Sequence, residues 1–247
     1  DGTLNDLYEN HLEDFVKYNI HDVRIVKKLD DKLDFIDVAR GICHVGHVPY
    51  EDIVYDSRFL EGAILVYLKK LGVVAPNKTP RDDVKKDGKF AGAYVQDPQK
   101  GRHDWVYDLD ITSMYPSIIM SLNVSPETKI GKVIGWDPEE FIRGKNKTYS
   151  IYMNDKKKGQ FTEIELKEYF DNNQVSISNN GIIYRTDKPG LIPTLLSEWF
   201  DKRTEYRKLA KKFSDEGDED QAGYFNRRQH IQKIVLNSMY GVLGLPV

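Results

Sequence analysis

Apolar residues recur at three- and four-residue steps through the first seventy residues, which is the period of an α-helix with one apolar face. The pattern predicts mainly helical structure over residues 4–71. A second helical run covers 57–71, with Asp56 and Ser57 as its cap and Gly72 as its stop. The apolar face of the first run is formed by Phe15, Ile20, Val23, Val26, Leu29, Leu33, Ile36 and Val38.

A polar connector over residues 75–88 separates these helices from a part of the chain that is typical of β-structure. Short apolar segments alternate there with turn residues, as an antiparallel sheet with insertions requires. The predicted strands are 93–95, 105–111, 129–134, 148–152 and 181–185.

The helical period returns at Leu195 and continues to a charged tip at residues 214–220, after which a second helix is predicted over 221–240. Two long helices joined by a short polar turn form an antiparallel hairpin. With the sheet before it, this hairpin predicts the α+β fold class.

Composition places the chain among ordinary globular proteins. Its 247 residues include 40% hydrophobic and 30% charged residues, which excludes wholesale disorder. The longest apolar run, 63–68, is too short to cross a bilayer. Cys43 is the only cysteine, so an intrachain disulfide and a cysteine-rich zinc site are excluded. Because the chain begins with Asp1 rather than Met, we expect a processed or excised piece.

The formal charge of −3 argues against a uniformly basic surface but leaves a local basic groove open. His44 and His47 have a spacing that metal ligands can have, yet solvated residues near a turn are the favoured interpretation.

The clearest candidate for chemistry is the run 107–119. A strand-like stretch ends there in a carboxylate and turns through Thr, Ser and Pro into an apolar helix-like run. A carboxylate beside the free amides of a helix start can hold a divalent cation next to phosphate oxygens. Asp108 and Asp110 fall on the same strand face, so spacing leaves both open. A strand with two exposed acids is the alternative interpretation.

A second candidate lies on the first helix of the hairpin. Arg203 and Arg207 stand one turn apart on one face, a spacing suited to gripping a polyphosphate. A solvated basic helix face is the alternative.

The second helix of the hairpin carries a third candidate. Gln229, Lys233, Asn237 and Tyr240 advance by four, four and three residues, so they form one stripe. The stripe combines two amides, a cation and an aromatic ring, groups that can neutralise a phosphate and pack against a base. A purely structural stripe remains the alternative.

Taken together, these runs resemble the family B DNA polymerases. Residues 110–119 (DITSMYPSII) resemble the first palm motif, D-x-x-S-L-Y-P-S-I-I. Residues 233–241 (KIVLNSMYG) resemble the fingers motif, K-x-x-x-N-S-x-Y-G, with Gln229 at the family's glutamine position. The resemblance implies a partial family B polymerase with an antiparallel palm sheet and helical-hairpin fingers.

Weaker matches extend the resemblance over most of the chain. Residues 18–22 (YNIHD) resemble the third motif of the proofreading exonuclease, Y-x-x-x-D, and 90–93 (FAGA) fall where the family has its Y-x-G-(G/A) loop. Residues 123–128 and 190–194 resemble the T-even bacteriophage branch.

The resemblance implies roles for the residues of the first palm motif. Asp110, rather than the acid two residues before it, would be a catalytic ligand of two Mg²⁺ ions, with the Ile111 carbonyl on one of them. The amides of Ser113 and Met114 would bind the triphosphate. Tyr115 would lie under the deoxyribose and exclude a 2′-hydroxyl.

For the fingers, the resemblance implies that Arg203 and the catalytic Lys233 hold the triphosphate. Arg207 stands where the phage relatives usually have Lys, which keeps the charge but changes the donor geometry. Asn237 and Tyr240 would line the pocket of the nascent base pair.

The exonuclease match implies that Asp22 is a metal ligand, with further divalent ions at that site, and that Tyr18 orients the attacking water. By the same resemblance, the domains are the end of a 3′–5′ exonuclease (1–36), a crossing segment and linker (37–92), the first half of the palm (93–189) and the fingers (190–247).

The family's second palm motif, with its Asp-Thr-Asp carboxylates, is not found in these 247 residues, nor are the first two exonuclease motifs. We therefore expect this piece alone to be inactive in both reactions. A truncated sequence, half of a split polymerase and an intein-flanked segment all remain open.

The partners that the resemblance implies are primer–template DNA, deoxynucleoside triphosphates, a sliding clamp and a C-terminal polymerase fragment with the second palm motif and the thumb. No membrane partner is expected, and a phage-encoded protein would act in the cytoplasm of the infected bacterium. The alternatives are a non-catalytic DNA-binding module, which the missing carboxylates favour, and a nuclease, which Tyr18 and Asp22 favour.

Overall fold

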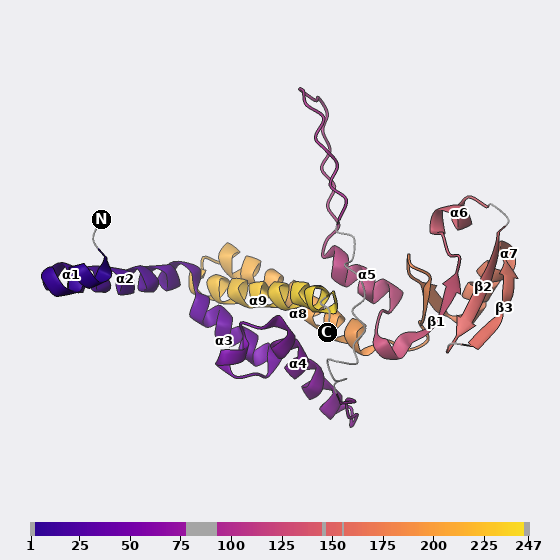
Figure 1. The fold of residues 1–247 in the computed structure, drawn as a ribbon, viewed down its shortest axis with the longest axis horizontal. Coiled ribbons are helices and arrows are strands. Elements are labelled where there is room, and N and C mark those ends of the chain that lie inside the picture. Colours follow the sequence, from indigo (N-terminus) through magenta and orange to yellow (C-terminus); the bar gives the residue numbers. More distant parts are fainter. Residues whose placement is uncertain (1–2, 78–92, 145–146, 155, 245–247) are drawn as a thin grey trace. The chain divides into compact units, whose positions relative to one another are not determined.

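The computed structural model describes residues 3–77, 93–144, 147–154 and 156–244, and over these the fold is α+β, as predicted (Figure 1). The chain divides into two compact units. The first comprises residues 3–74 and 203–232, and the second comprises the described residues of 75–202 and 233–244. Residues 90–92 of the expected loop between exonuclease and polymerase, and most of the polar connector, lie outside the described residues. None of the described helices is long and apolar enough to span a bilayer.

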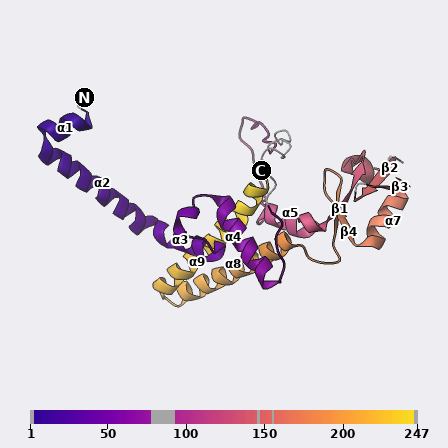
Figure 2. The ribbon, with the colours of Figure 1, turned by 60° about the horizontal axis from the view of Figure 1, so that its bottom comes forward.

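The first unit is helical, and its centre is the packing of α3 on α4 (Figure 2). Gly46 and Gly62 permit a close approach of the two backbones: a Cβ on Gly46 would lie 2.5 Å from the Phe59 Cβ, and one on Gly62 would meet the Gly46 carbonyl oxygen. Phe59 and Leu60 are buried at this contact. The N-terminal helices of the unit are α1 (Leu4–Asn10), α2 (Leu12–Leu33), α3 (Phe35–Gly46), the 3₁₀ turn η1 (Tyr50–Asp52) and α4 (Asp56–Lys70).

Helix α2 has the predicted apolar face, but no residue of the helix is buried. Val23 and Val26, for example, are 70% and 67% exposed. The periodicity therefore predicted the helix correctly, but its apolar face is mostly exposed. One contact on that face is the Tyr8 ring of α1 against Phe15, with centroids 5.4 Å apart.

The predicted helical hairpin is confirmed as α8 (Leu191–Asp215) and α9 (Glu219–Leu243), joined at a tip where Gly217 has a φ of +79°. Within the first unit the two helices pack through the rings of Phe213 and Phe225, which are stacked with centroids 5.5 Å apart.

The second unit contains a five-stranded antiparallel sheet of order β3-β2-β1-β5-β4. Helix α7 packs against this sheet and contributes Leu166 to a core with Val133, Tyr149, Ile151 and Ile183. The elements of this unit are α5 (Met114–Leu122), η3 (Pro126–Thr128), β1 (Lys129–Ile134), α6 (Pro138–Ile142), β2 (Thr148–Met153), β3 (Lys156–Thr162), α7 (Glu163–Asn173), β4 (Val175–Ile177) and β5 (Ile182–Arg185).

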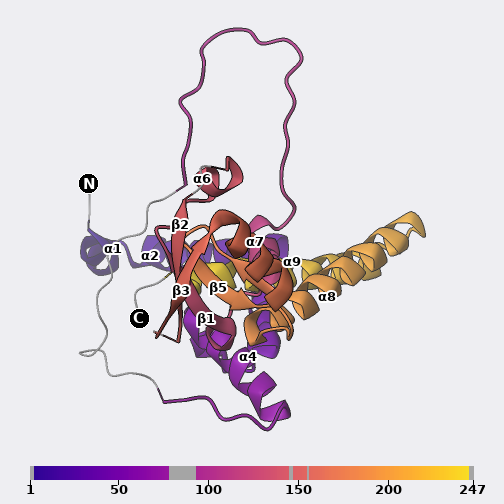
Figure 3. The ribbon, with the colours of Figure 1, turned by 90° about the vertical axis from the view of Figure 1, so that its right-hand side faces the viewer.

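Three predicted strands, 129–134, 148–152 and 181–185, are confirmed as β1, β2 and β5 to within one residue. The predicted strands 93–95 and 105–111 are wrong, because these residues lie in a long open loop without strand pairing (Figure 3). Their apolar side chains, such as Leu109 at 92% exposed, face solvent. A strand needs a neighbour for its backbone hydrogen bonds, and no described segment supplies one here.

The predicted cap of α4 is wrong, and some elements of the second unit were not predicted. Tyr55 is the N-cap of α4 and makes no side-chain capping bond, so Asp56 begins the helix and does not cap it. Strands β3 and β4 and helix α7 were not predicted from the sequence pattern. The start of α7 does carry a signal, since Thr162 and Glu165 form a reciprocal capping box.

Candidate functional site

The residues predicted to form the palm part of the site lie at the start of α5. Ser113 is the N-cap residue and holds a left-handed backbone, with φ 50° and ψ 49°. For a residue other than glycine this conformation costs about 1–3 kcal/mol, and such strain gathers at functional positions. Ser117 N–H donates to the Ser113 carbonyl (2.9 Å), which begins the helical ladder. The Met114 and Tyr115 amides precede that ladder and have no acceptor within the helix, so they can face an anion.

Asp110 and Ile111 lie just before this helix and are exposed. Asp108 is exposed as well, so burial does not separate the two acids. Because the strand predicted for 105–111 is absent, the carboxylate stands in a loop and not at a strand end. Among the described residues, no three His, Cys, Asp or Glu side chains gather as a metal site would need. Asp110 and the Ile111 carbonyl have the oxygen donors that Mg²⁺ prefers, but they do not complete a ligand set.

Two predicted residues from distant parts of the sequence meet in this unit. The ring of Tyr115, on α5, stacks on the ring of Tyr240, on α9, with centroids 3.8 Å apart and planes 7° from parallel. Both side chains are partly open to solvent, at 39% and 46% exposed. The stack joins the run 110–119 to the run 233–241, which in the sequence are linked only by the family resemblance.

The predicted stripe on α9 forms an exposed face of the helix. Lys233, Asn237 and Tyr240 are exposed, whereas Val235 and Leu236 between them are buried. The helix thus presents the ammonium, the amide and the ring on one side and its apolar residues on the other. Gln229, one turn earlier, is half-buried and donates from its side-chain amide to Asn226 Oδ1 (2.9 Å).

Arg203 and Arg207 lie on α8 within the first unit, one turn apart. Partial burial lowers the pKa of the Arg203 guanidinium from its ordinary value, and the positive charge of Arg207 lowers it further. The two cations therefore repel each other, and an anion bound against both would relieve that repulsion. Their convergence with Lys233 stays a prediction.

Tyr18 and Asp22 also belong to the first unit, where they lie one turn apart on α2 and are both exposed. An exposed tyrosine hydroxyl and a carboxylate on one helix face could orient a water and hold a cation. No third acidic or histidine side chain joins them among the described residues.

The residues that connect α5 to α8 stood out in the sequence only by their resemblance to the phage branch, and their structural role was not predicted. Asn123 is buried, and its side-chain amide donates to the carbonyls of Arg185 (2.6 Å) and Lys188 (2.8 Å). Its Oδ1 accepts from the Gly190 amide (2.8 Å). One side chain thus fixes the backbone that leads into α8.

The same loop caps the start of α8. Glu127 accepts from the Leu191 amide, and Ser125 Oγ accepts from the Ile192 amide (3.4 Å). These are first-turn amides that a helix cannot satisfy by itself. The two short runs that resembled the phage branch, 123–128 and 190–194, are therefore one hydrogen-bonded joint. Asn and Ser commonly cap helices, but no local signal in the sequence pairs these side chains with backbone groups more than sixty residues away.

The chain matches known proteins of one family. The family model described as DNA polymerase family B matches residues 55–247. The chain is similar to the DNA-directed DNA polymerases of Enterobacteria phage T4 (28% identical over 87% of the chain and 21% of that protein) and Escherichia phage RB69 (26%, over 84% and 20%). The solved family B DNA polymerase of Pyrobaculum calidifontis matches 94% of the chain and 25% of its own length, with a TM-score of 0.61 and 25% identity. The chain thus spans about a fifth of the length of its phage relatives.

Proposed function

This chain belongs to DNA polymerase family B, and we propose that the complete protein extends a DNA primer on a template from deoxynucleoside triphosphates. The observation that carries the proposal is the Tyr115–Tyr240 stack, which brings the palm run and the fingers run together in one unit. A nucleotide bound there would lie between the amides at the start of α5 on one side and the Lys233 ammonium on the other.

In the proposed reaction the primer 3′-hydroxyl attacks the α-phosphorus of the nucleotide, and pyrophosphate leaves. Such a transfer depends on positioning and on neutralising charge. The Ser113 and Met114 amides would hold phosphate oxygens, with Lys233, Arg203 and Arg207 as the cations. Asn237 and Tyr240 would border the base pair.

Two Mg²⁺ ions belong to this proposal, with Asp110 and the Ile111 carbonyl as the ligands that the chain supplies. Bound magnesium would neutralise the triphosphate and lower the pKa of the attacking hydroxyl. The described residues complete no such site, so further carboxylates have to come from the polypeptide that carries the second palm motif.

The test uses the complemented enzyme, by which we mean the 247-residue chain together with that polypeptide. We expect it to add nucleotides to a primer according to the template. DNA binding without incorporation would contradict the proposal and favour the non-catalytic binding module.

Replacing Lys233 by Ala should lower kcat/KM for nucleotide incorporation about 10- to 150-fold, the range for losing a charged hydrogen bond. Lys233 is exposed on α9, so the change leaves packing intact. Lys212→Ala is the matched control, because Lys212 is an exposed lysine that pairs with Glu216 near the hairpin tip. Equal kcat/KM values for the two variants would remove Lys233 from the site.

Replacing Tyr115 by Ala should let the complemented enzyme accept ribonucleotides, since the ring is the proposed barrier to a 2′-hydroxyl. A close-fitting barrier to one added hydroxyl is worth on the order of 100-fold in discrimination. Tyr115→Phe keeps the ring that stacks on Tyr240 and should keep the discrimination. The measurement is the ratio of kcat/KM for deoxynucleotide and ribonucleotide, and an unchanged ratio in Tyr115→Ala would contradict the role.

We also infer that the complete protein carries a 3′–5′ exonuclease, with Asp22 as a divalent-metal ligand and Tyr18 orienting the attacking water. Their placement one turn apart on an exposed face of α2 supports this role. The readout is release of nucleotides from the 3′ end of a mismatched primer.

Primer–template DNA, deoxynucleoside triphosphates and a sliding clamp are the other proposed partners, and the infected bacterial cytoplasm is the proposed compartment. The four domains expected from the sequence, 1–36, 37–92, 93–189 and 190–247, belong to the same proposal. It is supported by the similarity to the two phage polymerases.

A further inference from the structure

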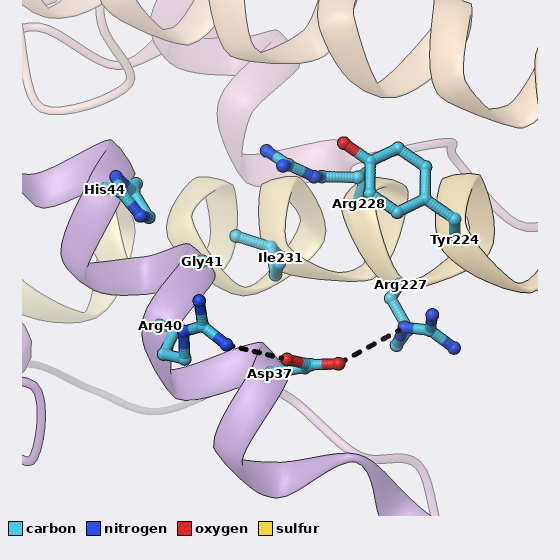
Figure 4. A pocket seen from close by; sticks show the side chains of 8 residues that line it. All are labelled: Asp37, Arg40, Gly41, His44, Tyr224, Arg227, Arg228 and Ile231. Carbon is cyan, nitrogen blue, oxygen red and sulfur yellow. Dashed lines mark ion pairs between the residues drawn. The ribbon is translucent and has the colours of Figure 1, made fainter.

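A cavity of about 200 Å³ lies within the first unit, between α3 and the first half of α9 (Figure 4). Its floor is the contact of Gly41 with Ile231, where a Cβ on the glycine would collide with the isoleucine side chain. Around this apolar floor stand mostly polar and charged groups. The cavity is lined by Asp37, Arg40, Gly41, His44, Tyr224, Arg227, Arg228 and Ile231.

The charged groups of the cavity form a chain of ion pairs across the two helices. Asp37 lies between Arg40 (3.5 Å) and Arg227 (4.0 Å), as Figure 4 shows. Arg227 also reaches Asp34, at 3.5 Å. The two carboxylates therefore hold two of the guanidinium groups in place and neutralise them.

The third guanidinium, that of Arg228, differs from the other two. It lies over the Tyr224 ring, 5.0 Å from the centroid, and none of the described carboxylates forms an ion pair with it. A cation–π contact orients the group but leaves its charge in place. Counting Asp34, which pairs with Arg227 from outside the lining, three guanidinium groups meet two carboxylates. One positive charge is therefore in excess, and Arg228 is the guanidinium without a carboxylate partner among the described residues.

The size of the cavity limits what can enter. Its volume of about 200 Å³ is below the roughly 300–1,000 Å³ of the pockets that bury whole small-molecule ligands. A single tetrahedral oxyanion fits, with the rest of its molecule outside. A guanidinium that is held over an aromatic ring suits phosphate, because its planar fork donates two parallel hydrogen bonds.

We propose that this α3–α9 cavity binds a phosphate group through Arg228, supplied either by the backbone of a single-stranded nucleic acid or by a free polyphosphate. This proposal rests on the proposed function in one respect: a DNA polymerase binds a template strand and releases pyrophosphate, so both sources of phosphate are available to it. Phosphate contacts of this kind position a strand without reading its sequence.

The experiment measures binding of a fluorescent single-stranded oligodeoxynucleotide to the 247-residue chain over a range of salt concentrations. Arg228→Gln should weaken binding about 10-fold and reduce the slope of log K against log salt by about 0.7, the value for one phosphate contact. Arg143→Gln is the matched control, an exposed arginine on the second unit that pairs with Glu139, and it should bind as the unchanged chain does. Arg228→Lys should restore the salt slope but only part of the affinity.

A parallel titration with inorganic pyrophosphate separates the two sources. An oligonucleotide effect without pyrophosphate binding assigns the cavity to a strand, and pyrophosphate binding that Arg228→Gln abolishes assigns it to a free polyphosphate. If Arg228→Gln folds, by its helical circular dichroism, and changes neither titration, the proposal is overturned. Both titrations measure binding and require no DNA synthesis. Failure of the polymerase proposal would instead be seen as absence of nucleotide incorporation by the complemented enzyme, so the two failures are distinguishable.

Discussion

Replacing Asp110 by Asn is expected to lower nucleotide incorporation by the complemented enzyme more than about 100-fold. The amide keeps the shape of the carboxylate and removes the charge that a divalent cation needs. Loss of groups that only support a metal ligand costs 10- to 100-fold, so loss of the ligand itself should exceed that range. Because Asp110 is exposed, the variant should fold unchanged. The measurement is single-turnover incorporation at saturating nucleotide and magnesium.

Asp108→Asn is the matched control for this experiment. The two acids are two residues apart, are both exposed and lie in the same loop. Spacing could not choose between them, and only the family motif selects Asp110. Asp108→Asn should therefore stay within about threefold of the unchanged enzyme, since a surface substitution away from the site has little effect. A large loss in Asp108→Asn with normal activity in Asp110→Asn would show that the motif is aligned in the wrong register.

The elements that were predictable from the sequence are those whose signal is local. The hairpin α8–α9 has a helical period on both sides of a charged tip, and β1, β2 and β5 are apolar runs between turn residues. Strand β3 was missed because it is an edge strand that begins with Lys156, Lys157 and Lys158, and charge on an edge hides the usual apolar alternation.

The segment 105–111 shows the opposite failure. Its apolar residues alternate as in a strand, yet a strand also depends on a neighbour elsewhere in the chain, and the pattern contains no information on that neighbour. Helix α2 is a similar case, since its periodicity predicts an apolar face without saying what covers it.

For the candidate site, residue types and motif spacing were enough to select Tyr115 and Tyr240, which the structure brings together. The joint at Asn123 could not be found in the same way. Its bonds run from one side chain to backbone groups more than sixty residues away, and such pairings depend on the folded path of the chain. The same holds for the Arg228 cavity, whose two walls come from opposite ends of the sequence.

Stability of the first unit should depend strongly on Gly62. Gly62→Ala is expected to lower the free energy of unfolding by about 1–3 kcal/mol, the usual cost of overpacking. Its Cβ would collide with the Gly46 carbonyl oxygen, a backbone atom that cannot rotate away. Helices α3 and α4 would have to separate, which would loosen the buried contacts of Phe59 and Leu60. Urea unfolding followed by the helical circular dichroism signal measures the change.

Gly223→Ala separates this packing effect from helix propensity. Gly223 also lies inside a helix of the first unit, α9, but its Cβ would meet only the far end of the Arg227 side chain, at an ordinary contact distance of 3.5 Å. Alanine is favoured over glycine in a helix interior by about 0.5–1 kcal/mol, so this variant should be more stable than the unchanged chain. Propensity alone would predict that both variants gain stability. A gain in Gly62→Ala would therefore show that α3 and α4 do not approach as closely as the structure places them, whereas opposite signs for the two variants would establish that backbone contact as the feature that requires glycine.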